Sequence, residues 1–380
     1  DLHSFPTRRS SDLHIVRFLL VALIGFLTLS SVFDWDPGPA PGVKIKNAIL
    51  YLLATGLLFR MAVDRKFVLQ LPAMATSFAV LIGWSILSYL AIVLVIDYPH
   101  YDVLKNAFDL KNFAVDHLLF FLVFFYGVRS TKDATFVLQC LLLSWVLSHL
   151  VAVLDATGFV QIGDIERRDD GRVQGLVGES NQYGAFVSLT LPALVAAAIA
   201  TRGAMRWFWG GAALLTMATL LMTVSRGAFV GVIVAGAAGA WMFRRYLSAT
   251  RIITWTAGAV LALVLVVVVI GVTYGELLYA RLIGQAMGTD MVGASSGRTE
   301  IWSNAIGVML EHPLTLLTGY GWNAYWSMPF RYSPHNYYLA QWFNLGLPGL
   351  VCSLLLLTLA VRTARAAVPY ALYGDRKSVV

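Results

Sequence analysis

The chain has 380 residues, of which 58% are hydrophobic and only 13% are charged, and its mean hydropathy is +0.71. Soluble domains usually carry about a quarter charged residues, so this composition excludes a soluble globular protein and indicates a polytopic membrane protein. The net charge of +7 does not indicate nucleic-acid binding, because the basic residues stand singly or in pairs between apolar segments, as the positive-inside rule distributes them.

Ten apolar segments predict an all-α protein with about ten transmembrane helices, since roughly 20 apolar residues cross a bilayer. In chain order they lie at about 15–33, 48–63, 74–96, 113–128, 134–154, 184–200, 207–223, 227–243, 253–272 and 345–361. The fourth segment carries Asp116 and His117, and the fifth carries His149; we interpret these three residues as packed between helices. Cys140 and Cys352 also fall in apolar segments, which indicates small core residues, not a disulfide.

The two ends of the chain differ in composition from the rest. We interpret residues 1–13 as a non-native or disordered N-terminus and residues 366–380 as a C-terminal tail, consistent with truncation of a longer chain. Between them, residues 14–272 hold the first nine predicted helices and residues 345–365 hold the tenth.

Basic clusters predict the orientation of the helices. With a cytoplasmic start, all of the clusters fall on the cytoplasmic side. They lie at residues 60–66, 129–132, 202–206, 244–251 and 362–365. Two long connections then fall outside, at 155–183 and 273–344, and long loops in a compact fold are usually functional. Within the second loop, apolar periodicity predicts helices at 299–311 and about 335–343, which we expect to lie on or in the outer interface.

The predicted outer side is rich in arginine and holds one histidine of interest, His335. The arginines are Arg226, Arg298, Arg331, Arg281, Arg167, Arg168 and Arg172. Guanidinium groups bind phosphates with two parallel hydrogen bonds, so this set indicates an anionic ligand such as a phosphate or pyrophosphate. A histidine beside such a ligand can act as a general base. No His, Cys, Asp or Glu cluster has metal-ligand spacing, and no nucleotide-binding motif is present, so we expect no metal and no cofactor.

Each of these residues also has a structural interpretation. His335 precedes an aromatic-rich helix and is compatible with an interfacial histidine. Arg226 is compatible with an anchor to lipid phosphate, and Arg298 with an ion pair to Glu300 or Glu311 on a helical face.

Four motifs in order along the chain resemble the O-antigen ligase and polymerase superfamily, the Wzy/WaaL-like membrane glycosyltransferases. They are Arg172-Val-Gln-Gly-Leu with Glu179-Ser-Asn-Gln-Tyr; Thr223-Val-Ser-Arg-Gly; Ser296-Gly-Arg-Thr-Glu-Ile-Trp with Pro313 and Gly319-Tyr-Gly; and His335-Asn-Tyr-Tyr-Leu with Gly346-Leu-Pro-Gly. In the first motif Ser180-Asn181 stands where the family usually has Pro-Asn.

The resemblance implies a GT-C-like membrane glycosyltransferase in the bacterial inner membrane, with its site facing the periplasm. The donor would be a glycan on undecaprenyl pyrophosphate, and the acceptor a hydroxyl of lipid A–core, of another glycan or of a protein. Arg226 and Arg298 would hold the pyrophosphate without a metal, and His335 would accept the acceptor's proton. The resemblance further implies substrate-binding roles for Arg172, Asn181, Ser225, Asn336, Tyr337, Gly319 and Gly321.

Other function classes stay open at this point. Ligase, polymerase and protein O-oligosaccharyltransferase share the donor and differ in the acceptor. A transporter of a lipid-linked anion would also need outer arginines and many spans, but it usually has paired broken helices in matching halves, which this sequence lacks. A structural or assembly protein without catalysis is the third class.

Overall fold

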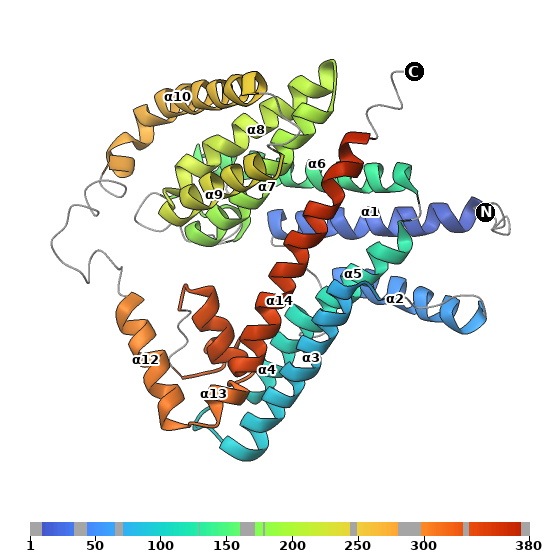
Figure 1. Ribbon diagram of the computed structural model, residues 1–380, viewed down its shortest axis with the longest axis vertical. Helices are drawn as coiled ribbons and strands as arrows, with labels where there is room; N and C mark the ends of the chain where they lie inside the picture. The colour runs from blue at the N-terminus through green and yellow to red at the C-terminus, as the bar shows by residue number, and fades with distance from the viewer. Residues whose placement is uncertain are drawn as a thin grey trace. The chain divides into compact units, whose positions relative to one another are not determined.

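The computed structural model describes residues 10–33, 44–64, 71–128, 130–159, 172–177, 179–243, 249–279, 298–329 and 334–373. Within these ranges the regular secondary structure is helical throughout and contains no strand, which confirms the predicted all-α class (Figure 1). All ten apolar segments lie in helices.

Among the residues that the structure describes, five helical stretches are long and apolar enough to cross a membrane, which supports a multi-pass membrane protein. They are Ile45–Val63, Ala73–Ile96, Thr131–Ala156, Ser180–Ala200 and Tyr337–Ala367. Shorter apolar stretches occur at Ile15–Thr28, Arg226–Met242 and Leu263–Val272. The count of ten crossings and the orientation in the membrane stay predictions.

The chain folds as two compact units, and each is described by itself. The first comprises Asp1–Pro37 and Arg129–Gly288, and the second comprises Gly38–Val128 and Thr289–Val380. Each unit therefore combines segments that are far apart in the sequence. Arg172 and Arg226 belong to the first unit, whereas Arg298 and His335 belong to the second.

In the first unit, α7 packs against α8 and α9 around Tyr183, Val187, Leu194 and Trp209. The helices of this unit are α1 (Ser10–Phe33), α6 (Thr131–Ala156), the 3₁₀ turn η3 (Gly175–Val177), α7 (Ser180–Ala200), α8 (Ala204–Thr223), α9 (Arg226–Phe243) and α10 (Ala249–Tyr279). Gly184 allows α7 and α9 to approach closely, because a Cβ there would lie 2.9 Å from the Cβ atoms of Ser225 and Ala228.

In the second unit, α3 runs along α14 and α2 packs on α5 (Figure 1). Its helices are α2 (Ile45–Val63), α3 (Ala73–Ala91), α4 (Val103–Leu110), α5 (Asp116–Gly127), α12 (Arg298–Glu311), α13 (Thr315–Thr318), the 3₁₀ turn η5 (Ala324–Trp326) and α14 (Tyr337–Tyr373). Two π-helical turns, η1 (Ile92–Ile96) and η2 (Lys111–Val115), extend α3 and join α4 to α5.

The turn η2 explains how Asp116 is accommodated in an apolar segment. A π turn aligns residues five apart, and Lys111 Nζ lies 2.9 Å from Asp116 Oδ2. The hydroxyl of Tyr51 on α2 donates to the other carboxylate oxygen at 2.8 Å. A buried carboxylate is costly unless it is paired and hydrogen-bonded, so this arrangement supports the interpretation that Asp116 packs between helices.

Helix α14 is bent at Gly346, which has a left-handed φ of 64°. A Cβ at this position would collide with the backbone carbonyl of Leu317, so only glycine fits. The bend divides α14 into a short first helix and a long second helix, as the sequence predicts. The predicted helix at 299–311 is confirmed as α12.

Residues 298–329 and 334–345 contribute to a small core with the end of α3. Phe343 is fully buried and stacks between Tyr325, at a ring-centroid distance of 4.0 Å, and Tyr320, at 4.7 Å. Met309 of α12 and Ile92 of η1 complete this core. Stacked aromatic pairs contribute about 0.5–1.5 kcal/mol beyond their burial, so the segment that carries Arg298 and His335 is built on a packed support.

Candidate functional site

His335 is exposed and its backbone is held on both sides. Its φ of 48° is left-handed, a conformation that costs a non-glycine residue about 1–2 kcal/mol. On one side, the carbonyl of buried Pro334 accepts a 2.6 Å hydrogen bond from the indole N–H of Trp302. On the other side, Asn336 Oδ1 accepts from the N–H groups of Tyr338 at 3.1 Å and Leu339 at 3.2 Å, which caps α14. The imidazole is therefore presented to the surroundings from a fixed backbone.

Arg298 is the first residue of α12 and is also exposed. Trp302 follows it by four residues, about 6 Å along the helix axis, on the same helix face. The tryptophan that binds the Pro334 carbonyl thus places the start of α12 beside the segment that ends at His335. In the described part of α12, Arg298 forms no ion pair with Glu300 or Glu311, so the surface ion pair considered from the sequence does not form.

Asn336 and Tyr337 flank this position in different ways. The side chain of Asn336 is engaged in the cap of α14, whereas Tyr337 is half-exposed and meets the exposed ring of Tyr338 edge-on at 5.9 Å. Contact of either residue with a substrate stays a prediction.

Gly319 and Gly321 are buried and support the bend of α14. Gly319 donates its N–H to Thr315 O at 2.8 Å, and Gly321 donates to Asn344 O at 2.7 Å. Both have positive φ, and a Cβ on Gly321 would lie 2.6 Å from Asn106 Oδ1. Their backbone donors are engaged within the protein, and a direct contact with substrate stays a prediction.

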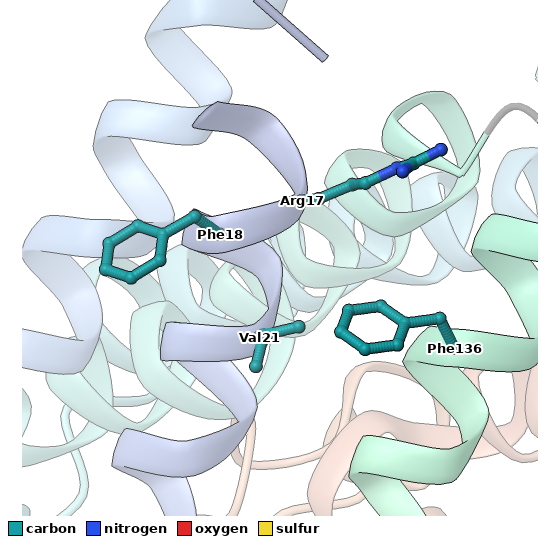
Figure 2. A pocket seen from close by; sticks show the side chains of 4 residues that line it. All are labelled: Arg17, Phe18, Val21 and Phe136. Atoms are coloured by element: carbon teal, nitrogen blue, oxygen red, sulfur yellow. The ribbon is translucent and has the colours of Figure 1, made fainter. Parts of the chain in front are cut away.

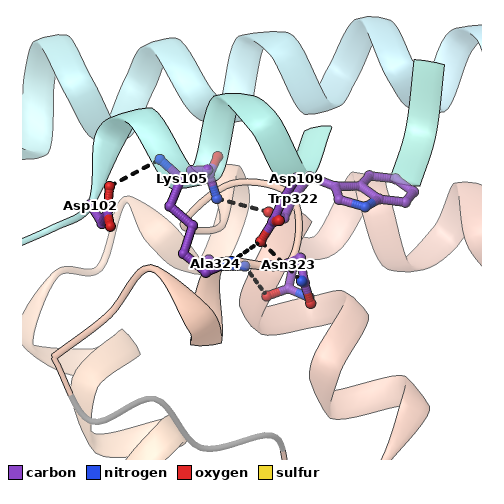
Figure 3. A network of polar contacts seen from close by, with 8 residues as sticks. Asp102, Lys105, Asp109, Trp322, Asn323 and Ala324 are labelled. Atoms are coloured by element: carbon purple, nitrogen blue, oxygen red, sulfur yellow. Dashed lines mark hydrogen bonds and ion pairs between the residues drawn. The ribbon is translucent and has the colours of Figure 1, made fainter. Parts of the chain in front are cut away.

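A polar network between α4 and the loop after Gly321 was not expected from the sequence (Figure 3). Asp109 Oδ2 lies 2.6 Å from Lys105 Nζ and accepts a 3.1 Å hydrogen bond from Asn323 Nδ2. Asn106, which is fully buried, donates to Trp322 O at 2.7 Å. The signal that could have identified this network is the polar spacing of residues 102, 105, 106 and 109 in a short helix.

In the first unit, Arg226 begins α9 directly after a tight turn. Val224 adopts a left-handed φ of 48° there, and the carbonyl of buried Ser225 accepts from Ala228 N at 3.1 Å and Phe229 N at 3.2 Å. Arg226 is partly exposed. The turn therefore fixes the backbone from which this guanidinium projects.

Arg172 braces the same turn from a neighbouring segment. It is 8% exposed, its Nε donates to Thr223 O at 2.9 Å, and its Nη2 donates to Asn181 Oδ1 at 3.0 Å. Glu179 Oε1 in turn accepts from Asn181 Nδ2 at 2.9 Å. The predicted residues Arg172, Asn181 and Ser225 therefore lie around the start of α9, where these contacts are made with the protein; their contact with substrate stays a prediction.

The strap that carries Arg172, residues 172–177, rests on a buried aromatic ring. A Cβ on Gly175 would lie 2.5 Å from the ring of Tyr183, so glycine permits this contact. His149 is fully buried, with its Nδ1 2.9 Å from the Tyr183 hydroxyl and its Nε2 2.8 Å from Thr190 Oγ1. His149 therefore fixes Tyr183, and Tyr183 supports the strap beside Arg226.

A cavity of about 330 Å³ lies between α1 and α6 of the first unit, away from these residues (Figure 2). Arg17, Phe18, Val21 and Phe136 line it, and Arg17 is ion-paired with Asp133 of α6. None of the predicted site residues contributes to it.

Several of the arginines and motif residues named from the sequence lie outside the described residues. They are Arg167, Arg168, Arg281, Ser296, Gly297 and Arg331. Across the described ranges, no three His, Cys, Asp or Glu side chains gather as a metal-binding group, and the expectation that no metal takes part stays a prediction.

Together, the fold and these positions define a helical multi-pass membrane protein with arginine and histidine side chains presented at helix starts. Residues 211–354 match the family described as O-Antigen ligase. This match supports the O-antigen ligase and polymerase superfamily, a group of glycosyltransferase-like enzymes, and confirms the resemblance carried by the three motifs that lie within residues 211–354. The matched region includes Arg226, Arg298 and His335, whereas Arg172 and Asn181 precede it. Comparisons with curated proteins and with solved structures gave no match.

Proposed function

We propose that this protein transfers a glycan from undecaprenyl pyrophosphate to an acceptor hydroxyl at the periplasmic face of the inner membrane, as an O-antigen ligase does. The observation that carries the proposal is the Trp302–Pro334 hydrogen bond. Through it, the helix that starts at Arg298 is tied to the residue that precedes His335. Arg298 and His335 are both exposed, which supports the proposal that they act on one substrate.

In the proposed reaction, the acceptor oxygen attacks the anomeric carbon of the donor sugar. The bond from this carbon to the phosphate oxygen breaks, and its electron pair leaves with the lipid pyrophosphate. His335 takes the proton of the acceptor hydroxyl, as histidine commonly does near neutral pH. General-base assistance contributes about 10²–10⁴ in rate, so charge stabilisation and positioning must supply the remainder.

We propose that Arg298 and Arg226 supply that stabilisation, as the motifs that carry them imply. Negative charge develops on the departing pyrophosphate, and fixed guanidinium groups stabilise it more in the transition state than in the ground state. Two supports favour this role for Arg226: the turn at Val224–Ser225 and the brace from Arg172 to Thr223 O. With arginines neutralising the leaving group, the proposed step needs no metal ion.

The proposal is tested by the His335→Ala variant in a strain that lacks the native gene. His100→Ala is a matched control, because His100 is also exposed and also left-handed, with a φ of 58°. We expect His335→Ala to insert normally and to abolish glycan attachment, while His100→Ala retains it. Attachment at normal levels in His335→Ala would refute the catalytic role.

The same strain identifies the acceptor. Accumulation of unligated long polymer indicates a ligase, core with at most one repeat indicates a polymerase, and normal lipopolysaccharide with missing protein glycans indicates an O-oligosaccharyltransferase. Movement of lipid-linked sugar across vesicles by the purified protein, without any transfer, would instead support a transporter.

A further inference from the structure

Helices α12 and α13 carry a row of exposed aliphatic side chains on a segment too short to cross a membrane. Ile306 is 40% exposed, Leu310 60%, Leu314 45% and Leu317 51%. The row contains no charge and continues over the turn between the two helices. Contiguous exposed apolar surface of this kind marks a contact with a membrane or another molecule.

The row is separate from the two other faces of α12. One face buries Ala305 and Met309 in the core that contains Tyr320, Tyr325 and Phe343. At about 100° per residue, Ile306 lies about 160° around the helix from Asn304, and Leu310 lies about 100° from Glu311. Asn304 and Glu311 are both exposed. Packing in the core therefore does not account for the exposed aliphatic row. The edge of α12 that carries Asn304 and Glu311 can face water.

Helix α13, which carries Leu317, packs on a membrane-type helix of the same unit. Leu317 contributes the carbonyl that packs against Gly346 at the bend of α14. Immediately after the bend, Leu347 and Val351 are exposed on the long second helix, which is long and apolar enough to cross a bilayer. The exposed surface of α13 is thus adjacent to a surface that faces lipid.

Helix α4 of the same unit shows that this region is built for a lipid environment. It buries the polar residues Asn106 and Asp109 beside Leu110 and exposes the apolar residues Leu104 and Phe108. A surface helix of a soluble protein shows the opposite arrangement, with apolar side chains buried and polar side chains exposed. Apolar side chains are therefore exposed at two separate places of this unit: the row on α12 and α13, and the outer face of α4.

We infer that α12 and α13 lie against the bilayer through Ile306, Leu310, Leu314 and Leu317, with lipid acyl chains covering the row. Amphipathic helices bind membranes in this way, with the apolar face buried at the boundary between headgroups and chains. Because α12 begins at Arg298, this contact holds its guanidinium at the membrane surface. The use of Arg298 at this surface rests on the proposed function, because a lipid-linked pyrophosphate would lie at the same surface. The membrane contact of α12 and α13 does not depend on the proposed function.

Single-cysteine variants labelled with an environment-sensitive fluorophore test the inference. Cys140 and Cys352 are first replaced by Ala, and the protein is placed in nanodiscs that contain lipids with spin labels on their acyl chains. Leu310→Cys and Leu314→Cys should be strongly quenched by these lipids, whereas the controls Asn304→Cys and Glu311→Cys should be quenched weakly. If a Leu310 variant fails to insert, Ile306→Cys replaces it.

Equal quenching at both edges of α12 would overturn the inference. So would shielded, blue-shifted emission at positions 310 and 314 without quenching by the labelled lipids, because a second copy or another protein would then cover the row. The measurement needs no glycan transfer, so its outcome is independent of whether the proposed activity is correct.

Discussion

Replacing Trp302 by Phe removes the indole N–H and keeps an aromatic ring against the core that contains Tyr320, Tyr325 and Phe343. The lost bond to the Pro334 carbonyl is 2.6 Å long. A net hydrogen bond contributes about 0.5–1.5 kcal/mol, and a buried carbonyl left unpaired costs about 1–3 kcal/mol, so we expect about 1–3 kcal/mol of destabilisation. The backbone ahead of His335 also loses its link to α12. Since a displacement of about 1 Å at a reacting group can cost about 10²-fold in rate, we expect turnover to fall between about 10- and 100-fold.

The assay follows transfer from a lipid-linked donor by purified protein in nanodiscs, together with thermal unfolding. Trp84→Phe is the matched control, because its indole donates a 2.7 Å bond to Leu345 O at the bend of α14. Both variants should lose similar stability, and only Trp302→Phe should lose most of its turnover. Equal turnover in the two variants would refute the reasoning that Trp302 positions His335.

Three further predictions follow from the site. Arg298→Lys and Arg226→Lys should each lower turnover at least about tenfold without loss of folding, because a lysine cannot donate two parallel hydrogen bonds to phosphate. Full activity of either variant in a transfer assay would argue against binding of the pyrophosphate by these arginines. Arg172→Lys should lower the free energy of unfolding by about 1–3 kcal/mol, because one ammonium cannot replace the fork that binds Thr223 O and Asn181 Oδ1; an unchanged melting temperature would contradict the brace. Burial raises the pKa of Tyr320 from 10.0 to about 12, so the folded state keeps a proton that the unfolded state loses. The resulting stabilisation is full below pH 10 and is lost as the pH rises towards 12, and melting curves of Tyr320→Phe should decline less steeply over that interval.

The positions of the helices could be predicted from the sequence because they depend on local properties. Apolar length and the charges between segments predict the helical stretches, and a period near 3.6 predicts α12 to within one residue. The π turn η2 could not be predicted. It depends on the pairing of Lys111 with Asp116 and on the hydroxyl of Tyr51, which lies on another helix 65 residues away from Asp116.

In the candidate site, too, some features could be predicted from the local sequence and others depend on tertiary contacts. Residue type and topology indicate Arg226, Arg298 and His335, because few other side chains bind phosphate or accept protons there. The supports behind them are tertiary: Trp302 bonds a carbonyl 32 residues away, and Arg172 bonds one 51 residues away. Gly319 and Gly321 were expected at the substrate, whereas the packing of the loop on Asn344 accounts for their conformation. A motif alone does not distinguish these two reasons for a glycine.

The central claim is that Arg226, Arg298 and His335 act on one diphosphate. Its most direct test is a cryo-EM structure of the His335→Ala variant with a lipid-linked pyrophosphate donor bound. We predict the diphosphate within hydrogen-bond distance, about 3 Å, of both guanidinium groups, with the anomeric carbon facing position 335. A diphosphate bound by one arginine alone, or Arg226 and position 335 on opposite faces of the membrane, would contradict the account.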